Sequence, residues 1–351
     1  MRTTCGPLPL TVVAMITAVL TSGCQPAADD TPPGSADVSA RYIGSVEILD
    51  PALSRLLDPD ARPEILAEGF DWSEGPVWVD DGEYVLFSDI PPNTIHRWKQ
   101  GEGLTTFLHP SGYTGTEARA GEVGSNGLTL DNEGRLVLAQ HGDRRIARLA
   151  TSLANPEPTY ETLASHYAGM RFNSPNDLVY HSSGALYFTD PPYGLEKNMD
   201  DPAKEIDFQG VYRLATDGTV TLLTDELSRP NGIAFSPDES TLYVANSDPE
   251  NPIWMAYDIT DDGLTTNGRI FFDATVLAES GSRGLPDGLK IDAAGNLFAT
   301  GPGGVLVFSA DGTHLGTIQT TQATSNCAIG NDGSVLYMTA DMYLLRISLQ
   351  P

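Results

Sequence analysis

Six short units of one design run along the chain and constrain its fold more than any other feature. In each unit a residue with a side-chain oxygen opens an apolar run, and a polar turn and a second apolar run follow, as in NGLTLDNEGRLVLAQH and NGIAFSPDESTLYVAN. The opening residues lie 39 to 56 residues apart and are Glu74, Asn126, Asn176, Asn231, Asp287 and Asn326. Four-stranded propeller blades with loop insertions repeat every ~40–50 residues. The sequence therefore predicts an all-β fold, a six-bladed β-propeller with a central channel, in which each opener begins an innermost strand.

The last unit is short of one strand, which bears on how the ring closes. After Asn326 the sequence offers three strand-like runs, AIG, VLYMTA and YLLRISL. An open sheet edge would be left unless another part of the chain supplied a fourth strand. Residues 63–67, directly before the first unit, are the best candidate for that strand, and residues 46–49 are the second candidate.

The N-terminus predicts export. An uncharged stretch at residues 8–20 has the length of a signal-peptide apolar region and is too short to span a bilayer comfortably. Thr21-Ser22-Gly23-Cys24 follows and resembles a bacterial lipoprotein signal, in which the cysteine is lipidated; an ordinary secretory signal is the alternative. We expect a signal peptide at 1–23, lipidation at Cys24, a flexible tether at 24–40 and the propeller at 41–351. This places the protein in the periplasm, anchored by lipid to the outer membrane.

The charge balance restricts the partners. The formal net charge is −27, from 47 acidic and 20 basic residues. Such a surface repels nucleic-acid phosphates, which require clustered lysine and arginine, so nucleic-acid binding is excluded. The same surface attracts cations. We expect membrane contact only through the lipid anchor, and the sequence leaves the oligomeric state open.

The openers have the chemistry of a cation site. Glu74 and Asp287 supply two negative charges, while Asn176 and Asn231 supply neutral carbonyl oxygens. Oxygen ligands suit Ca²⁺ best and also accommodate Mg²⁺ and Mn²⁺. Zn²⁺ is a weaker candidate, because no Cys or His stands at an opener position. The alternative is that these side chains only cap strand ends. Two carboxylates around a narrow channel would repel each other without a cation, which favours the metal site.

A second polar layer follows from hairpin geometry. The strand that returns after each turn ends on the face where the opener lies, about fourteen or fifteen residues later. Asp89, Asp190 and Asn246 stand at these positions and are predicted to bind substrate, as are Asn126 and Asn176. His141 stands there too, and it could relay a proton beside a metal. A hydrogen bond from His141 to a substrate hydroxyl or to a neighbouring loop is the alternative.

Several longer runs resemble the SMP-30/gluconolactonase/regucalcin family. They are EGPVW at 74–78, FSDIP at 87–91, HGDRR at 141–145, NSPNDL at 173–178, FTDPPYGL at 188–195, RPNGIAFSPDE at 229–239 and LPDG at 285–288. The resemblance implies one divalent cation at the channel mouth, bound by the family's ligands at Glu74, Asn176, Asn231 and Asp287. It also implies that Asp287 is the general base and that Asn126 lines the pocket. The loop at 114–125 departs from the family, because it is longer and more acidic.

These observations predict a metal-dependent lactonase that opens small sugar lactones such as glucono-1,5-lactone to aldonic acids. Two alternatives remain open at this point. One is a hydrolase of other lactones, phosphoesters or organophosphates that uses the same site, since one fold serves many substrates. The other is a non-catalytic ligand-binding propeller of the cell envelope.

Overall fold

The computed structural model describes residues 1, 6 and 40–350 of the chain. Nearly all of the predicted signal peptide, most of the tether and the lipidation residue Cys24 lie outside the described residues, so these assignments stay predictions. Among the described residues no helix is long and apolar enough to cross a membrane. The compact unit begins at Ala40, and the description below concerns that unit.

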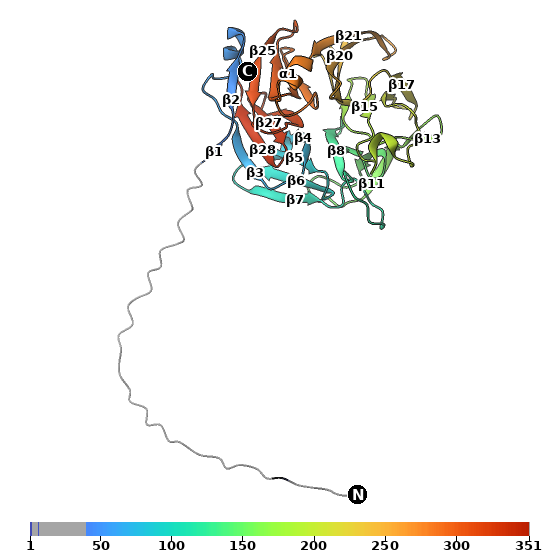
Figure 1. Cartoon of the computed structure of the whole chain (residues 1–351). Helices are drawn as coiled ribbons and strands as arrows, with labels where there is room; N and C mark the ends of the chain where they lie inside the picture. Colours follow the sequence, from blue (N-terminus) through green and yellow to red (C-terminus); the bar gives the residue numbers. More distant parts are fainter. Residues whose placement is uncertain (2–5, 7–39, 351) are drawn as a thin grey trace, which may run out of the picture. The chain divides into compact units, whose positions relative to one another are not determined.

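Six antiparallel sheets form a closed ring in this unit (Figure 1). The strand at one end of each sheet contacts its counterparts in the two neighbouring sheets, in the order β4, β8, β14, β18, β22, β26 and back to β4. These six strands therefore surround the central channel. Each begins within two residues of an opener, which confirms the six-bladed propeller and the predicted innermost strands.

The strands of the first three blades follow one another directly in sequence. Blade one contains β4 (Ser73–Val79), β5 (Tyr84–Asp89), β6 (Thr94–Lys99) and β7 (Gly103–Leu108). Blade two contains β8 (Ser125–Leu130), β9 (Leu136–Gln140), β10 (Arg145–Leu149) and β11 (Tyr160–Ala164). Blade three contains β14 (Leu178–Tyr180), β15 (Leu186–Asp190), β16 (Gly210–Leu214) and β17 (Val220–Thr224). A separate hairpin pairs β12 (His166–Tyr167) with β13 (Met170–Arg171).

The last three blades use both ends of the chain. Blade four contains β18 (Pro230–Phe235), β19 (Thr241–Asp248), β20 (Asn251–Ile259) and β21 (Thr265–Asp273). Blade five contains β22 (Leu289–Ile291), β23 (Leu297–Gly301), β24 (Gly304–Phe308), β25 (His314–Gln319) and β2 (Ser45–Ile48). Blade six contains β26 (Asn326–Gly330), β27 (Val335–Ala340), β28 (Tyr343–Ser348), β3 (Glu64–Glu68) and β1 (Arg41–Tyr42). The described helical turns are η1 (Pro51–Arg55), η2 (Asp80–Gly82), η3 (Asn198–Asp200) and α1 (Thr275–Glu279).

Ring closure follows the first of the two predicted alternatives. Strand β3, which covers the predicted segment 63–67 apart from Pro63, pairs antiparallel with β28 and completes blade six. Strand β2, which covers most of the second candidate at 46–49, pairs instead with β25 of blade five. The N-terminal part of the compact unit thus covers the outer edges of two blades and leaves fewer unpaired strand edges.

The core lies between neighbouring sheets, so most strands are apolar on both faces. Between blades one and two, Leu86 and Leu138 are fully buried in one cluster, and between blades four and five Trp254 packs with Leu306 and Phe308. This packing fixes the spacing of the blades and therefore the positions of the innermost strands around the channel.

Candidate active site at the channel mouth

The backbone turns the openers toward the channel by the same device in several blades. In β4 the pairing register shifts between Glu74 and Val77, and equivalent shifts surround Asn126 in β8 and Asn231 in β18. A bulge of this kind breaks the strict alternation of side chains and redirects one of them. Asn176 and Asp287 lie two residues before their strands, and their backbone N–H groups donate to Thr189 O and Thr300 O of the returning strands.

Gly75 shows how closely the first two blades approach each other here. Its φ of +54° lies in the left-handed region, and a Cβ atom added to it would lie 2.1 Å from Asn126 O. Only glycine accommodates both the conformation and the approach. The residue after Glu74 is therefore fixed by the need to bring Glu74 and Asn126 to the same cavity.

Five of the six openers line one cavity of about 360 Å³. They are Glu74, Asn126, Asn176, Asn231 and Asp287, and they come from five different blades. The volume lies within the range of about 300–1,000 Å³ that small-molecule sites occupy. Five of the six side chains that were predicted to converge therefore share one cavity, while their roles there stay predictions.

Four of the five openers that line the cavity have a side-chain oxygen without a partner in the described part of the chain. The Oδ1 atoms of Asn126, Asn176, Asn231 and Asp287 are buried and accept no hydrogen bond there. Burial together with the charge of Asp177 raises the pKa of Glu74 to about 8. Burial and the charge of Glu74 raise the pKa of Asp287 well above its ordinary value. Buried oxygens need a partner, and two neighbouring carboxylates ionise readily only when a positive charge offsets their repulsion. Both features indicate a site for a positively charged ligand.

The donor set fits a hard divalent cation. Among the described residues no group of three or more His, Cys, Asp and Glu side chains is placed to hold a metal ion. A cation at this place would therefore rely on amide oxygens as well as carboxylates, as Ca²⁺ and similar ions accept. Glu74, Asn176, Asn231 and Asp287 provide two of each kind.

Asn326, the sixth opener, does not line the cavity. Strand β26 pairs with β27 from Asn326 to Gly330 without a register shift, so no bulge turns this side chain toward the mouth. Its Oδ1 instead accepts from Cys327 N at 2.8 Å, and its Nδ2 donates to Asp177 Oδ2 at 3.4 Å. Asp177, which lies near the cavity, was not predicted as a site residue from the sequence. It is buried, follows Asn176 in the chain, and its charge helps to raise the pKa of Glu74.

The predicted second layer lies behind the cavity wall. Asp89 accepts from the backbone N–H groups of Asp71 and Trp72, and Asn246 accepts from Arg229 N. Asp190 of blade three likewise accepts from two backbone N–H groups, those of Asn173 and Ser174. None of these three lines the cavity, and their positions do not support the expectation that they bind substrate. Each holds the loop that leads into the opener of its own blade, which is a supporting role.

Asp190 allows a test of this supporting role. Its Oδ2 and Oδ1 accept from Asn173 N at 2.7 Å and Ser174 N at 2.8 Å, and all three residues are fully buried. We expect Asp190→Ala to lower the free energy of unfolding by about 2–4 kcal/mol, because two buried N–H groups lose their acceptor. Denaturant unfolding measures this, with the exposed Asp261→Ala as control, for which a change within about 0.5 kcal/mol is expected. Equal stability of the two variants would contradict the assignment.

His141 is fully buried and does not line the cavity. Burial lowers its pKa to about 3, so the ring is neutral at physiological pH. Neither ring nitrogen has a hydrogen-bond partner among the described residues, and Nδ1 lies 3.7 Å from Glu122 Oε2. The proposed proton relay through His141 gains no support from this position. The ring lies close to Glu122 of the neighbouring loop but makes no hydrogen bond to it, so a hydrogen bond to substrate or loop also stays a prediction.

Several residues that line the cavity were not predicted as site residues from the sequence. They are Trp72, Glu122, Tyr193, Arg229 and Ser247. Arg229 and Tyr193 fall inside the runs RPNGIAFSPDE and FTDPPYGL, where the surrounding motif was the available signal. Glu122 lies in the loop at 114–125 and has no periodic pattern around it. Partial burial raises the pKa of Glu122 to about 7.

Fold and cavity together define a class: a six-bladed β-propeller with a small-molecule site at one mouth of its channel, built from carboxylate and amide oxygens. The model of the SMP-30/Gluconolactonase/LRE-like region matches residues 72–341, and the chain belongs to this family. A gluconolactonase of Zymomonas mobilis is 39% identical over 96% of this chain and 93% of its own. The pentonolactonase XacC of Haloferax volcanii is 29% identical over 76% of this chain and 80% of its own.

A solved structure agrees with the fold. A gluconolactonase of Xanthomonas campestris superposes with a TM-score of 0.75 at 31% identity and covers 91% of this chain and 99% of its own. The resemblance stated from the sequence motifs is thereby confirmed.

Proposed function

We propose that this protein is a lactonase that hydrolyses sugar lactones such as glucono-1,5-lactone to aldonic acids with the help of one divalent cation. The observation that carries the proposal is the convergence of five openers on one cavity, four of them with an unpartnered Oδ1. Family membership and the gluconolactonase and pentonolactonase relatives support the reaction class.

The cation would be held by Glu74, Asn176, Asn231 and Asp287. Ca²⁺ is the best match to these ligands, with Mg²⁺, Mn²⁺ and Zn²⁺ as substitutes. When bound, it would act as a Lewis acid on the lactone carbonyl and stabilise the negative charge that develops on the carbonyl oxygen.

The residues of the chain supply the remaining steps. With the repulsion from Glu74 offset by a cation, Asp287 stays ionised and accepts a proton from the attacking water. The water oxygen bonds to the carbonyl carbon, the ring C–O bond breaks, and the leaving ring oxygen takes the proton held by Asp287 to become a hydroxyl group. The lactone and one water thus give one hydroxy acid. Asn126 and Tyr193 line the cavity beside these groups and would orient the ring.

A substrate panel tests the proposal. Purified protein with Ca²⁺ is expected to hydrolyse glucono-1,5-lactone well above the spontaneous rate, measured by proton release in weakly buffered solution. Pentonolactones, an aryl phosphodiester and an organophosphate triester are the comparison substrates. Turnover of phosphorus esters without lactones would favour the other hydrolase. Binding of gluconate without hydrolysis of any substrate would favour the ligand-binding propeller.

A further inference from the structure

The loop between β7 and β8 carries an acidic side chain to the cavity that does not belong to the ring of openers. Glu122 lines the cavity wall together with Glu74 and Asp287. Its side chain is 37% exposed. Among the described residues its carboxylate accepts no hydrogen bond, and the neutral ring of His141 approaches it with Nδ1 at 3.7 Å. Glu122 is therefore a free acceptor at the edge of the proposed substrate site.

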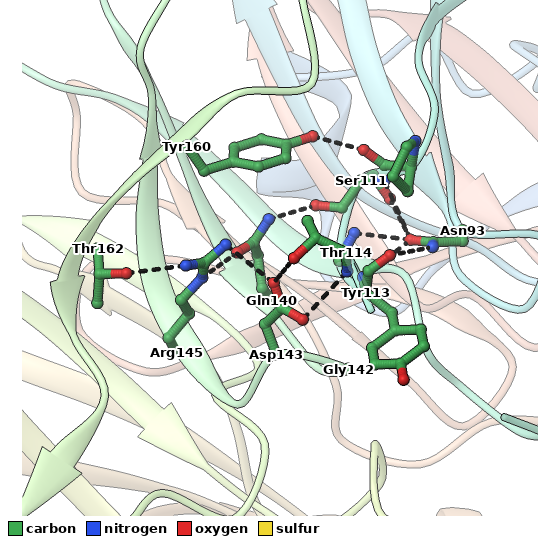
Figure 2. A network of polar contacts seen from close by, with 12 residues as sticks. Asn93, Ser111, Tyr113, Thr114, Gln140, Gly142, Asp143, Arg145, Tyr160 and Thr162 are labelled. Carbon is green, nitrogen blue, oxygen red and sulfur yellow. Dashed lines mark hydrogen bonds and ion pairs between the residues drawn. The ribbon is translucent and has the colours of Figure 1, made fainter. Parts of the chain in front are cut away.

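The first part of this loop is fixed by one side chain. Asn93 Oδ1 accepts from the backbone N–H groups of Ser111, Gly112 and Tyr113 at 3.0, 2.7 and 3.1 Å. Its Nδ2 donates to Tyr113 O at 2.8 Å (Figure 2). A single asparagine thus satisfies four backbone groups and sets the path of the chain as it leaves blade one.

A second set of contacts ties the loop to blade two. Figure 2 shows that Thr114 bonds to both carboxylate oxygens of Asp143, which also accepts from Arg145 at 2.9 Å. Arg145 donates to Gln140, and Gln140 Nε2 donates to Ser111 O at 2.6 Å. The loop therefore rests on the returning hairpin of the neighbouring blade.

The residues around Glu122 are held just as firmly. Arg119 donates to Gly142 O at 2.6 Å and to Gly194 O at 3.0 Å, and its guanidinium lies 5.1 Å from the centre of the Tyr113 ring. Directly after Glu122, Val123 O accepts from Gly142 N at 3.2 Å. Glu122 is therefore presented to the cavity on a braced segment, as a binding residue needs to be.

We propose that Glu122 is a specificity-determining residue that accepts hydrogen bonds from ring hydroxyls of the substrate, and that Arg119 positions it. Carboxyl oxygens accept hydrogen bonds, and once ionised the group has only acceptor sites, so Glu122 pairs with a hydroxyl-bearing ring and gains nothing from a ring without hydroxyls. The site thereby selects polyhydroxylated lactones over plain cyclic esters. This inference rests on the proposed function and extends it.

The test compares two substrates of the same ring size, glucono-1,5-lactone and δ-valerolactone, which lacks the hydroxyls. Glu122→Ala is expected to lower the ratio of their kcat/KM values by about 10- to 100-fold, the effect of losing hydrogen bonds to a charged acceptor. Most of the change should appear as a raised KM for gluconolactone. Arg119→Ala should shift the ratio in the same direction by a smaller factor, with partial recovery in Arg119→Lys.

Two controls separate this role from others. Glu117→Ala removes the same charge from an exposed position of the same loop and should leave the ratio within about twofold. Calorimetric titration with Ca²⁺ should give Glu122→Ala the cation affinity of the wild type within about threefold, whereas a large loss would make Glu122 a cation ligand and overturn the inference. An equal loss on both substrates, or none, would also overturn it. If the wild type hydrolyses neither lactone, the proposed function itself fails.

Discussion

Replacing Asp287 with asparagine is expected to reduce kcat for glucono-1,5-lactone by about 10²- to 10⁴-fold, the usual contribution of a positioned general base. The substitution preserves shape and leaves an oxygen at the position of Oδ1, which has no partner among the described residues. It removes the negative charge and the capacity to accept a proton. Initial rates of proton release at saturating lactone measure the effect.

The control for this variant is Asp261→Asn, which makes the same chemical change at an exposed turn between β20 and β21. It should retain wild-type turnover. Circular dichroism and thermal unfolding of Asp287→Asn should show an intact propeller, because the substitution relieves the repulsion between Asp287 and Glu74. A folded Asp287→Asn protein with turnover within about threefold of the wild type would remove Asp287 from the chemistry.

The ring of six blades could be predicted from the sequence because the repeat period and the polar openers both reflect the start of an innermost strand at the channel. Each innermost strand must begin at the channel, and a polar residue at that point marks the strand even where alternation is weak. The closing strand could also be predicted, because an unpaired edge in blade six demands a partner and β3 lies directly before the first unit. The pairing of β2 with blade five had no such signal.

Side-chain direction was harder to predict than position. Asn326 has the same place in its unit as Asn126, but β26 lacks the bulge that turns the side chain to the mouth. Asp190 and Asn246 lie at the predicted ends of their strands. Their side-chain oxygens, however, accept hydrogen bonds from backbone N–H groups of the adjoining loops. Hairpin geometry fixes where a strand ends and leaves open which group the side chain meets.

The loops contribute cavity residues that the repeat pattern could not predict. Glu122 comes from a loop whose path depends on a side chain of blade one, Asn93, and on Asp143 from blade two. Contacts between segments so distant in sequence leave no periodic trace. The departure of this loop from the family pattern was visible, but its consequence for the cavity was not.

The central claim is that oxygens from separate blades hold one cation that lactone hydrolysis requires. Its most direct test is to remove divalent metal with a chelator, confirm the removal by elemental analysis, and measure gluconolactone turnover while Ca²⁺ is added back. We predict a loss of at least about 100-fold, since Lewis-acid stabilisation is worth several kcal/mol, and full recovery at one equivalent per chain. Undiminished turnover by protein shown to be free of metal would contradict the account.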